Sequence, residues 1–353
     1  MSRQRRDPSE LTFEQAAERY LGRKRGSKAD ATVREYGYRL NRFRQWADEE
    51  GLETVGELHP LDFDDYLASR EADEVQPITM QKHFGTIREF VEFLERLGAV
   101  DGGLSDAVPD VDVPRGGDVN DEMLDVDEGD ALIRYYRGSD EHYGTREHAM
   151  LEVIWMVGCR LGAVRGLDLT DFDPRGESLS FHHRPEGDTP LKKGIDGERV
   201  VALPTPTVDA IDHYVNIYRP EVRDENGREP LFTSTQGRLA ENTVRNTCYR
   251  ATQPCIRISC PHGKRRDSCE WRQYTKASQC PSSRGPTAIK TGAVTRMLHN
   301  TSRDRVRHRA NTSQWDNYDH ATEEQKMEER DRGTLGDIEL GADEDDDQTE
   351  DTS

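Results

Sequence analysis

The sequence predicts a mainly α-helical protein with a small antiparallel β-sheet, an α+β fold class. Two patterns predict this class. Apolar residues recur at helical spacing through most of the chain, whereas residues 178–183 and 198–203 alternate apolar and polar side chains like the two strands of a hairpin. A stretch rich in Gly, Pro and Asp over residues 101–130 interrupts the periodicity, and we interpret it as an acidic linker between two domains.

Four helices are predicted in residues 1–100. The third begins at His59-Pro60, and the fourth begins with Thr79 as its cap and ends at Gly98. The first two carry apolar stripes made of Phe13, Ala16, Ala17, Tyr20 and Leu21, and of Val33, Tyr36, Leu40, Phe43 and Ala47. Because short amphipathic helices bury their apolar faces only against one another, we expect a helical bundle with the aromatic residues in its core.

The charge of the chain is concentrated in particular segments. Asp and Glu number 69 against 49 Lys and Arg, which gives a formal net charge of -20. Residues 333–353 contain nine acids and no base, and this composition predicts a disordered acidic tail. Only nine of the 49 basic residues are Lys, and an acidic, Lys-poor composition favours the hypothesis of a halophilic, salt-accumulating source.

Two stretches are basic against this background. Residues 23–44 hold eight Lys or Arg against two acids, and residues 242–296 hold eleven against two. An isolated cluster of this kind is commonly a solvated surface that offsets nearby acids. Two clusters in two linked domains instead favour a clamp around a phosphate backbone.

The central block, residues 131–332, carries the candidate catalytic residues. A helical run from His148 to Val157 leads into Gly158-Cys-Arg160-Leu-Gly162. An Arg between two glycines at a helix end either caps the last carbonyls of the helix or holds an anionic ligand. In the turn of the predicted hairpin, Lys192 and Lys193 are placed where a mobile cation can reach such a ligand.

These residues resemble the tyrosine recombinases, or phage-type integrases, and specifically their haloarchaeal branch. The resemblance implies a SAM-like core-binding domain in residues 1–100 and a tyrosine recombinase catalytic domain in residues 131–332. It implies that Arg160 is the first catalytic arginine, that Lys192 or Lys193 is the hairpin lysine, and that Tyr318 is the nucleophile. In this family a tyrosine attacks a DNA phosphodiester to form a 3′-phosphotyrosine, while arginines hold the non-bridging oxygens and the lysine protonates the leaving oxygen.

Three positions depart from the family pattern. Where the family has His-x-x-Arg, this chain has Thr287 and Lys290. Thr287 cannot exchange a proton near neutral pH, and Lys290 keeps a positive charge without the planar fork of an arginine. The family's next position, a His or Trp, falls near Asn311, and the residues that flank Asn311 give no clean match to the family pattern. We therefore expect catalysis to be impaired or absent unless other residues supply the missing histidine and arginine functions.

Five of the six cysteines lie between residues 248 and 280. In a reducing compartment such a cluster favours a metal over disulfides. A structural zinc ion bracing an inserted loop over residues 255–280 is one interpretation; buried reduced thiols or a redox-dependent disulfide are the others. The candidate zinc ligands are Cys255, Cys260, His262, Cys269 and Cys280.

The leading hypothesis is site-specific DNA recombination or integration through Tyr318 by a homo-tetramer on two DNA duplexes, with no cofactor needed for catalysis. The alternative is a catalytically inactive, integrase-derived protein that binds double-stranded attachment-site DNA and regulates it. A zinc-stabilised regulator unrelated to recombination does not account for the segment around Arg160. Because no run of 18 apolar residues and no signal-like N-terminus occur, we expect a cytoplasmic, nucleoid-associated protein without a membrane partner.

Overall fold

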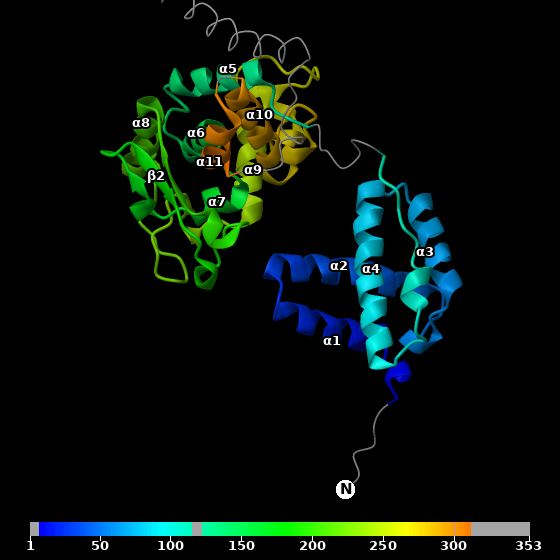
Figure 1. Ribbon diagram of the computed structural model, residues 1–353. Coiled ribbons are helices and arrows are strands. Elements are labelled where there is room, and N and C mark those ends of the chain that lie inside the picture. The colour runs from blue at the N-terminus through cyan, green and yellow to red at the C-terminus, as the bar shows by residue number, and fades with distance from the viewer. Residues whose placement is uncertain (1–6, 115–121, 300, 312–353) are drawn as a thin grey trace, which may run out of the picture. The chain divides into compact units, whose positions relative to one another are not determined.

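The computed structural model describes residues 7–114, 122–299 and 301–311, and the chain divides into two compact units at Asn120–Asp121 (Figure 1). The described residues form a mainly helical structure with two small antiparallel sheets, so the predicted fold class is confirmed. Within them, no helix combines the length and the apolarity that a membrane crossing would require. The predicted acidic tail and Tyr318 lie outside the described residues.

The first unit is a bundle of four helices, α1 (Phe13–Arg25), α2 (Asp30–Glu49), α3 (Pro60–Ala72) and α4 (Pro77–Leu97). Thr12 caps α1 by accepting a hydrogen bond from the backbone N–H of Gln15. The fourth helix starts at Pro77 and not at Thr79, because proline at the first helical position already has the helical φ and lacks the N–H that would be unpaired there. Gly98 ends it in the left-handed conformation, with φ of 70°.

Aromatic side chains fill the core of this bundle, as predicted. The Phe43 ring lies 5.7 Å from Trp46, stacked, and 5.1 Å from Tyr66, edge to face. Residues of the predicted linker also contribute, since Leu104 and Val108 are buried against the bundle and Arg88 donates a hydrogen bond to the Val108 carbonyl. This unit thus extends beyond its last long helix.

The second unit is built around α6 (Arg146–Val157), which packs against α5 (Val126–Arg137), α8 (Thr205–His213), α9 (Glu241–Ala251) and α10 (Pro286–Leu298). Nearly every residue of α6 is buried, which is the pattern of a helix at the centre of a domain. The short helix α7 (Leu161–Gly166) follows it directly, and α11 (Arg303–Ala310) packs against α10 and β3.

A three-stranded antiparallel sheet lies in the second unit, in the order β1 (Phe172–Asp173), β2 (Ser178–Phe181) and β3 (Arg199–Ala202). The predicted hairpin corresponds to β2 and β3, paired so that Leu179 faces Val201. A further two-stranded sheet joins β4 (Thr233–Ser234) to β5 (Gly237–Arg238).

A network of arginines and carboxylates ties the segment after α7 to these sheets. Arg238 pairs with Asp168, and it also reaches Asp224 at 2.8 Å. Arg184, in the hairpin loop, contacts Asp171 at 2.6 Å. All three carboxylates are nearly inaccessible to solvent, and each is paired with an arginine that balances its buried charge.

Candidate active site

Arg160 is placed by the sharp end of α6. Gly158 adopts a left-handed conformation with φ of 69°, and a Cβ added there would lie 3.0 Å from the Cβ of Ala310. The N–H of Gly158 bonds to the Ile154 carbonyl and closes α6. Arg160 does not cap that helix; it adopts an extended conformation and donates a hydrogen bond from Nη1 to the carbonyl of Asn311, at 3.1 Å. The interpretation of Arg160 as a cap of α6 is therefore wrong.

Both candidate lysines lie in the loop between β2 and β3. Lys193 precedes a short 3₁₀ turn, Gly194–Gly197, in which Gly194 has φ of 60°. Partial burial and the positive charges of Arg160, Arg307 and Arg199 together lower the pKa of Lys193 from its ordinary value. The hairpin therefore brings Lys193 into the neighbourhood of Arg160.

Lys290 lies on α10 and is buried, with 2% of its surface exposed. Burial, the charge of Arg160 and the charges of Lys192 and Lys193 lower the pKa of Lys290 to about 7. Arg160, the two hairpin lysines and Lys290 are thus brought together from three separate segments of the chain. We call these four residues the cationic pocket.

Thr287 precedes Lys290 by one turn on α10, next to Pro286 at the first helical position. Its side chain is exposed, and its carbonyl accepts a hydrogen bond from the Thr291 hydroxyl at 3.0 Å. Asn311 ends α11 with φ of 52° and meets Arg160 through its main-chain carbonyl. The structure thus brings Asn311 to Arg160 by its backbone, a contact that does not depend on the type of its side chain.

Arg199 is a neighbour of the pocket that the sequence did not single out. It lies opposite Phe181 in the hairpin register, and its guanidinium stands 4.2 Å from the centre of that ring. It donates hydrogen bonds to the carbonyls of Arg309 at 2.9 Å and Gly197 at 3.0 Å. An arginine facing an aromatic residue across the predicted strands was the available signal, since such pairs are favourable across a sheet.

Arginines also hold α11 against the rest of the unit. Arg309 donates to the carbonyl of Met156 at 2.7 Å, at the end of α6, and to the carbonyl of Ala202 at 2.9 Å, at the end of β3. Because Arg199 binds the Arg309 carbonyl in return, α11 and β3 are connected in both directions. The chain leaving α11 therefore starts from a fixed point beside Arg160.

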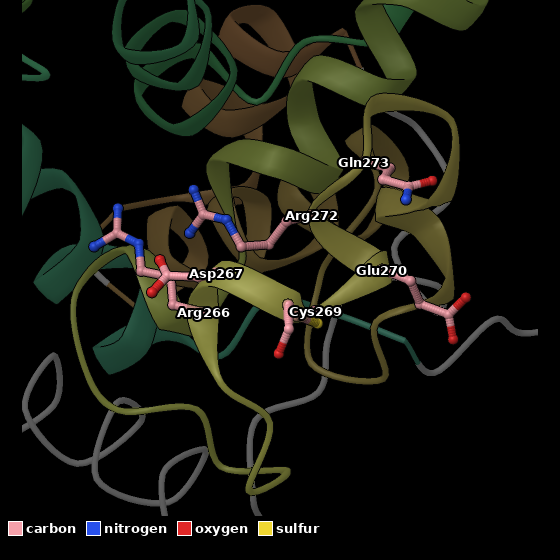
Figure 2. A pocket seen from close by; sticks show the side chains of 7 residues that line it. Arg266, Asp267, Cys269, Glu270, Arg272 and Gln273 are labelled. Carbon is pink, nitrogen blue, oxygen red and sulfur yellow. The ribbon is translucent and has the colours of Figure 1, made fainter.

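The predicted zinc site is not formed. Within residues 122–299, which include all five candidate ligands, no three His, Cys, Asp or Glu side chains gather as a metal-binding group. His262 contacts the Ser282 hydroxyl at 3.0 Å, and Cys269 lines a separate cavity of about 400 Å³. Figure 2 shows Arg266 and Arg272 on one side of that cavity and Glu270 and Gln273 on the other. All six cysteines are free, so the interpretation as reduced thiols agrees with the structure.

Hydrogen bonds hold the cysteine-containing loop. Gln253 donates to the Trp271 carbonyl at 2.7 Å, and the Thr252 hydroxyl accepts from the N–H of Arg284 at 2.7 Å. Burial raises the pKa of the Cys280 thiol, and so does its proximity to Cys255 and Cys260. The clustering of the cysteines in the sequence indicated a shared location, but it does not fix where the sulfurs point.

Comparison with known proteins finds similarity to integrases and recombinases. A family model described as the phage integrase N-terminal SAM-like domain matches residues 18–98. Tyrosine recombinase XerD of Bifidobacterium longum is 27% identical over 233 residues, which is 64% of this chain and 71% of that protein. The chain is therefore similar to tyrosine recombinases, and its residues 18–98 match a phage integrase domain. XerD of Mycobacterium tuberculosis strain H37Rv is 26% identical over 227 residues, 62% of this chain and 69% of that relative.

Solved structures of integrases share the fold of this chain. The Tn1549 transposon integrase in complex with transposon right end DNA has a TM-score of 0.61 at 14% identity, over 91% of this chain and 99% of that one. A lambda integrase dimer bound to a COC′ core site has a TM-score of 0.58 at 12% identity, over 92% of this chain and 78% of that one. The architecture is thus a SAM-like core-binding domain joined to an integrase catalytic fold.

Proposed function

We propose that this chain catalyses site-specific recombination or integration of double-stranded DNA, with Tyr318 as the nucleophile. The observation that carries the proposal is the cationic pocket, where Arg160, Lys192, Lys193 and Lys290 converge although they lie on separate segments. Four cations that converge in this way form a site suited to a phosphodiester. The matches to tyrosine recombinases over both units support the same reaction.

Each residue has a separate role in the proposed reaction. Arg160 has further N–H donors beyond the one that bonds to Asn311, and these hold the non-bridging oxygens where charge builds up. The Tyr318 oxygen attacks phosphorus and loses its proton to solvent. The P–O bond to the 5′ oxygen breaks, and Lys192 or Lys193 gives that oxygen a proton. The product is a 3′-phosphotyrosine, and the reverse steps join a second strand.

The chain length permits this role for Tyr318. It lies seven positions after Asn311, and an extended chain of that length spans at most about 25 Å. Because the Asn311 carbonyl is bonded to Arg160, a chain of this length is long enough to bring Tyr318 to the cationic pocket. A tetramer on two duplexes is the proposed active assembly; the lambda integrase structure, a dimer on its core site, supports assembly on DNA. The protein would act in the cytoplasm, at the nucleoid.

The second candidate is an inactive DNA-binding protein that regulates attachment-site DNA. Thr287 favours it, since an exposed threonine cannot serve as an acid or a base at the position where relatives have histidine. A haloarchaeal source remains a prediction from the acidic, Lys-poor composition.

Covalent trapping separates the two candidates. The full chain is incubated with a pool of random-sequence duplexes that each carry a nick, so that a cleaved strand diffuses away and the protein–DNA adduct persists. If the natural protein forms adducts that survive denaturation and Tyr318→Phe forms none, the chain is a recombinase that uses Tyr318. Sequencing the trapped strands then identifies its DNA site. If both proteins retain DNA equally and neither forms an adduct, the chain is the inactive DNA-binding protein of the second candidate.

A further inference from the structure

A cavity of about 180 Å³ lies in the second unit, near the start of α6. Its lining comes from the end of α5, the segment that leads into α6, the end of α9 and the inserted loop over residues 255–280. Arg160 follows the other end of α6, a helix of 12 residues that is about 18 Å long. The cavity is therefore separate from the cationic pocket.

Three arginines line this cavity, Arg250 near the end of α9 and Arg266 and Arg272 in the inserted loop. Arg266 and Arg272 also border the neighbouring cavity, and their guanidinium groups extend in the same direction (Figure 2). The guanidinium carbon of Arg250 lies 5.8 Å from the centre of the Tyr274 ring, and Nη1 of Arg272 lies 3.9 Å from the Cys255 sulfur. These two contacts leave most of the guanidinium N–H donors available to a ligand.

The charge of the lining is positive. Glu147 is the carboxylate among the lining residues, and it lies 3.9 Å from Arg146. Among the residues that the structure describes, no carboxylate forms an ion pair with any of the three arginines. Three guanidinium groups against one carboxylate give an excess of positive charge, which favours an anionic ligand.

His142 adds a further polar group to the lining. Its Nε2 atom is buried and has no hydrogen-bond partner among the described residues, with the Glu141 carboxylate at 3.9 Å. Tyr136, by contrast, donates its hydroxyl hydrogen to the Ala251 carbonyl at 3.2 Å. Because a buried polar atom without a partner is unfavourable, a ligand that bonds to Nε2 of His142 would gain stability there.

We propose that this cavity binds one phosphate group. A phosphate offers enough acceptor oxygens for three guanidinium groups, which bind such oxygens in bidentate pairs, whereas a carboxylate offers only two oxygens. The volume of about 180 Å³ is below the roughly 300–1,000 Å³ of sites for larger ligands, so the cavity suits a single small group. The phosphate can belong to a free anion or to a DNA backbone, and the site does not depend on recombination by Tyr318.

Protection of the arginines from chemical modification tests the site in the unmodified full chain. Phenylglyoxal, which reacts with guanidinium groups, is applied with inorganic phosphate or with chloride at equal ionic strength, and mass spectrometry locates the modified residues. With phosphate at ten times its Kd, modification of Arg266 and Arg272 should slow by about tenfold. Arg245, an exposed residue of α9 outside the cavity, is the internal control and should react equally in both salts. Equal rates at Arg266 and Arg272 in the two salts would overturn the proposal.

A pair of variants on α9 tests whether the three arginines share one ligand. Arg250→Gln should abolish the protection of Arg266 and Arg272 by phosphate, whereas Arg245→Gln should leave it unchanged. Protection that persists in Arg250→Gln would show that the three arginines do not form a common site.

A 30-base-pair duplex in place of inorganic phosphate identifies the source of the phosphate group. Protection of Arg266 and Arg272 by the duplex assigns the site to a DNA backbone. Protection by inorganic phosphate alone assigns it to a free phosphate compound. A chain that binds no duplex but is protected by inorganic phosphate would lose the proposed function and keep this site, so the two failures are distinguishable.

Discussion

Arg160 and Asn311 lie 151 positions apart in the chain and are joined by a hydrogen bond of 3.1 Å from Nη1 to the main-chain carbonyl. The bond connects the turn after α6 to the end of α11, from which the chain continues toward Tyr318. The same guanidinium belongs to the cationic pocket. The proposed function therefore gives Arg160 two roles, binding phosphate and positioning the segment that leads to Tyr318.

Replacing Arg160 by lysine tests whether a positive charge is sufficient or whether the planar guanidinium is also needed. Lysine keeps the positive charge but cannot hold two phosphate oxygens and the Asn311 carbonyl with one planar group. Arg160→Lys should lower the rate of adduct formation by at least about 100-fold, the usual effect of losing one contact to developing charge, and change duplex affinity little. Arg305→Lys, at an exposed position of α11, is the control and should react at the natural rate. Equal rates in the two variants would contradict the role of Arg160.

Gly158 and Gly98 form a natural matched pair, because their φ values are 69° and 70°. A Cβ at Gly98 would meet nothing within 4 Å, whereas one at Gly158 would approach Ala310 and Val294 at 3.0 and 3.2 Å. Gly98→Ala should cost only the conformational penalty, about 1 kcal/mol. Gly158→Ala should add about 1–3 kcal/mol from steric overlap. Urea unfolding of each variant checks the difference, and equal losses would mean that the close packing at Gly158 is not needed.

The fold was largely predictable from local patterns. Helical periodicity located the first-unit helices, and alternation located β2 and β3, because both signals depend on neighbours within a few residues. The start of α4 at Pro77 instead of Thr79 shows the limit of cap assignment from sequence. The predicted hairpin placed Lys192 and Lys193 in its connecting loop, where the structure has them.

Long-range relationships were not predictable. Nothing local to Asn311 indicates that its carbonyl meets Arg160, and nothing local to Lys290 indicates its burial among cations. Cysteine spacing indicated a shared loop but could not decide between zinc and free thiols, because ligand geometry depends on how the loop folds. Arg160 lies 151 positions from Asn311 and 130 positions from Lys290, and a pattern read along one chain does not contain relationships over such separations.

Glu152 is a carboxylate in the interior of the second unit, with 0% exposure. Burial would raise its pKa, but hydrogen bonds with His148 and Arg137 and their charges outweigh burial, so the pKa of Glu152 is lowered. A depressed folded pKa means that this stabilisation is present above the unfolded value of about 4.5 and is lost as the pH falls below it. Acid unfolding of the second unit should therefore begin in that range.

Glu152→Gln tests the contribution of this carboxylate. The amide has nearly the same shape and still accepts from the Thr207 hydroxyl, which lies 2.9 Å away in the natural protein, but it leaves Arg137 without an ionic partner. We expect a loss of about 3–5 kcal/mol at pH 7, the usual effect of breaking a buried pair, and a smaller loss below pH 4. Glu147→Gln, on the same helix and partly exposed, is the control and should change stability by less than about 0.5 kcal/mol. A pH-independent loss would show that packing and not charge is responsible.

Restoring the two family residues on α10 tests whether the departures limit catalysis. Thr287 is exposed, so histidine fits there without repacking and supplies a group that exchanges protons near neutral pH. Lys290 is buried, and an arginine there should cost about 1–3 kcal/mol of stability while giving a permanent charge. If proton transfer limits the reaction, Thr287→His alone should raise the adduct rate by about 100-fold.

The double variant Thr287→His/Lys290→Arg discriminates further. It should cleave faster than either single variant if both groups contact the transition state. Tyr318→Phe in the same background is the control and should form no adduct. An adduct rate in the double variant no higher than in the natural protein would mean that the present residues already supply what the reaction needs, with Lys290 in its protonated form carrying the charge that arginine would provide.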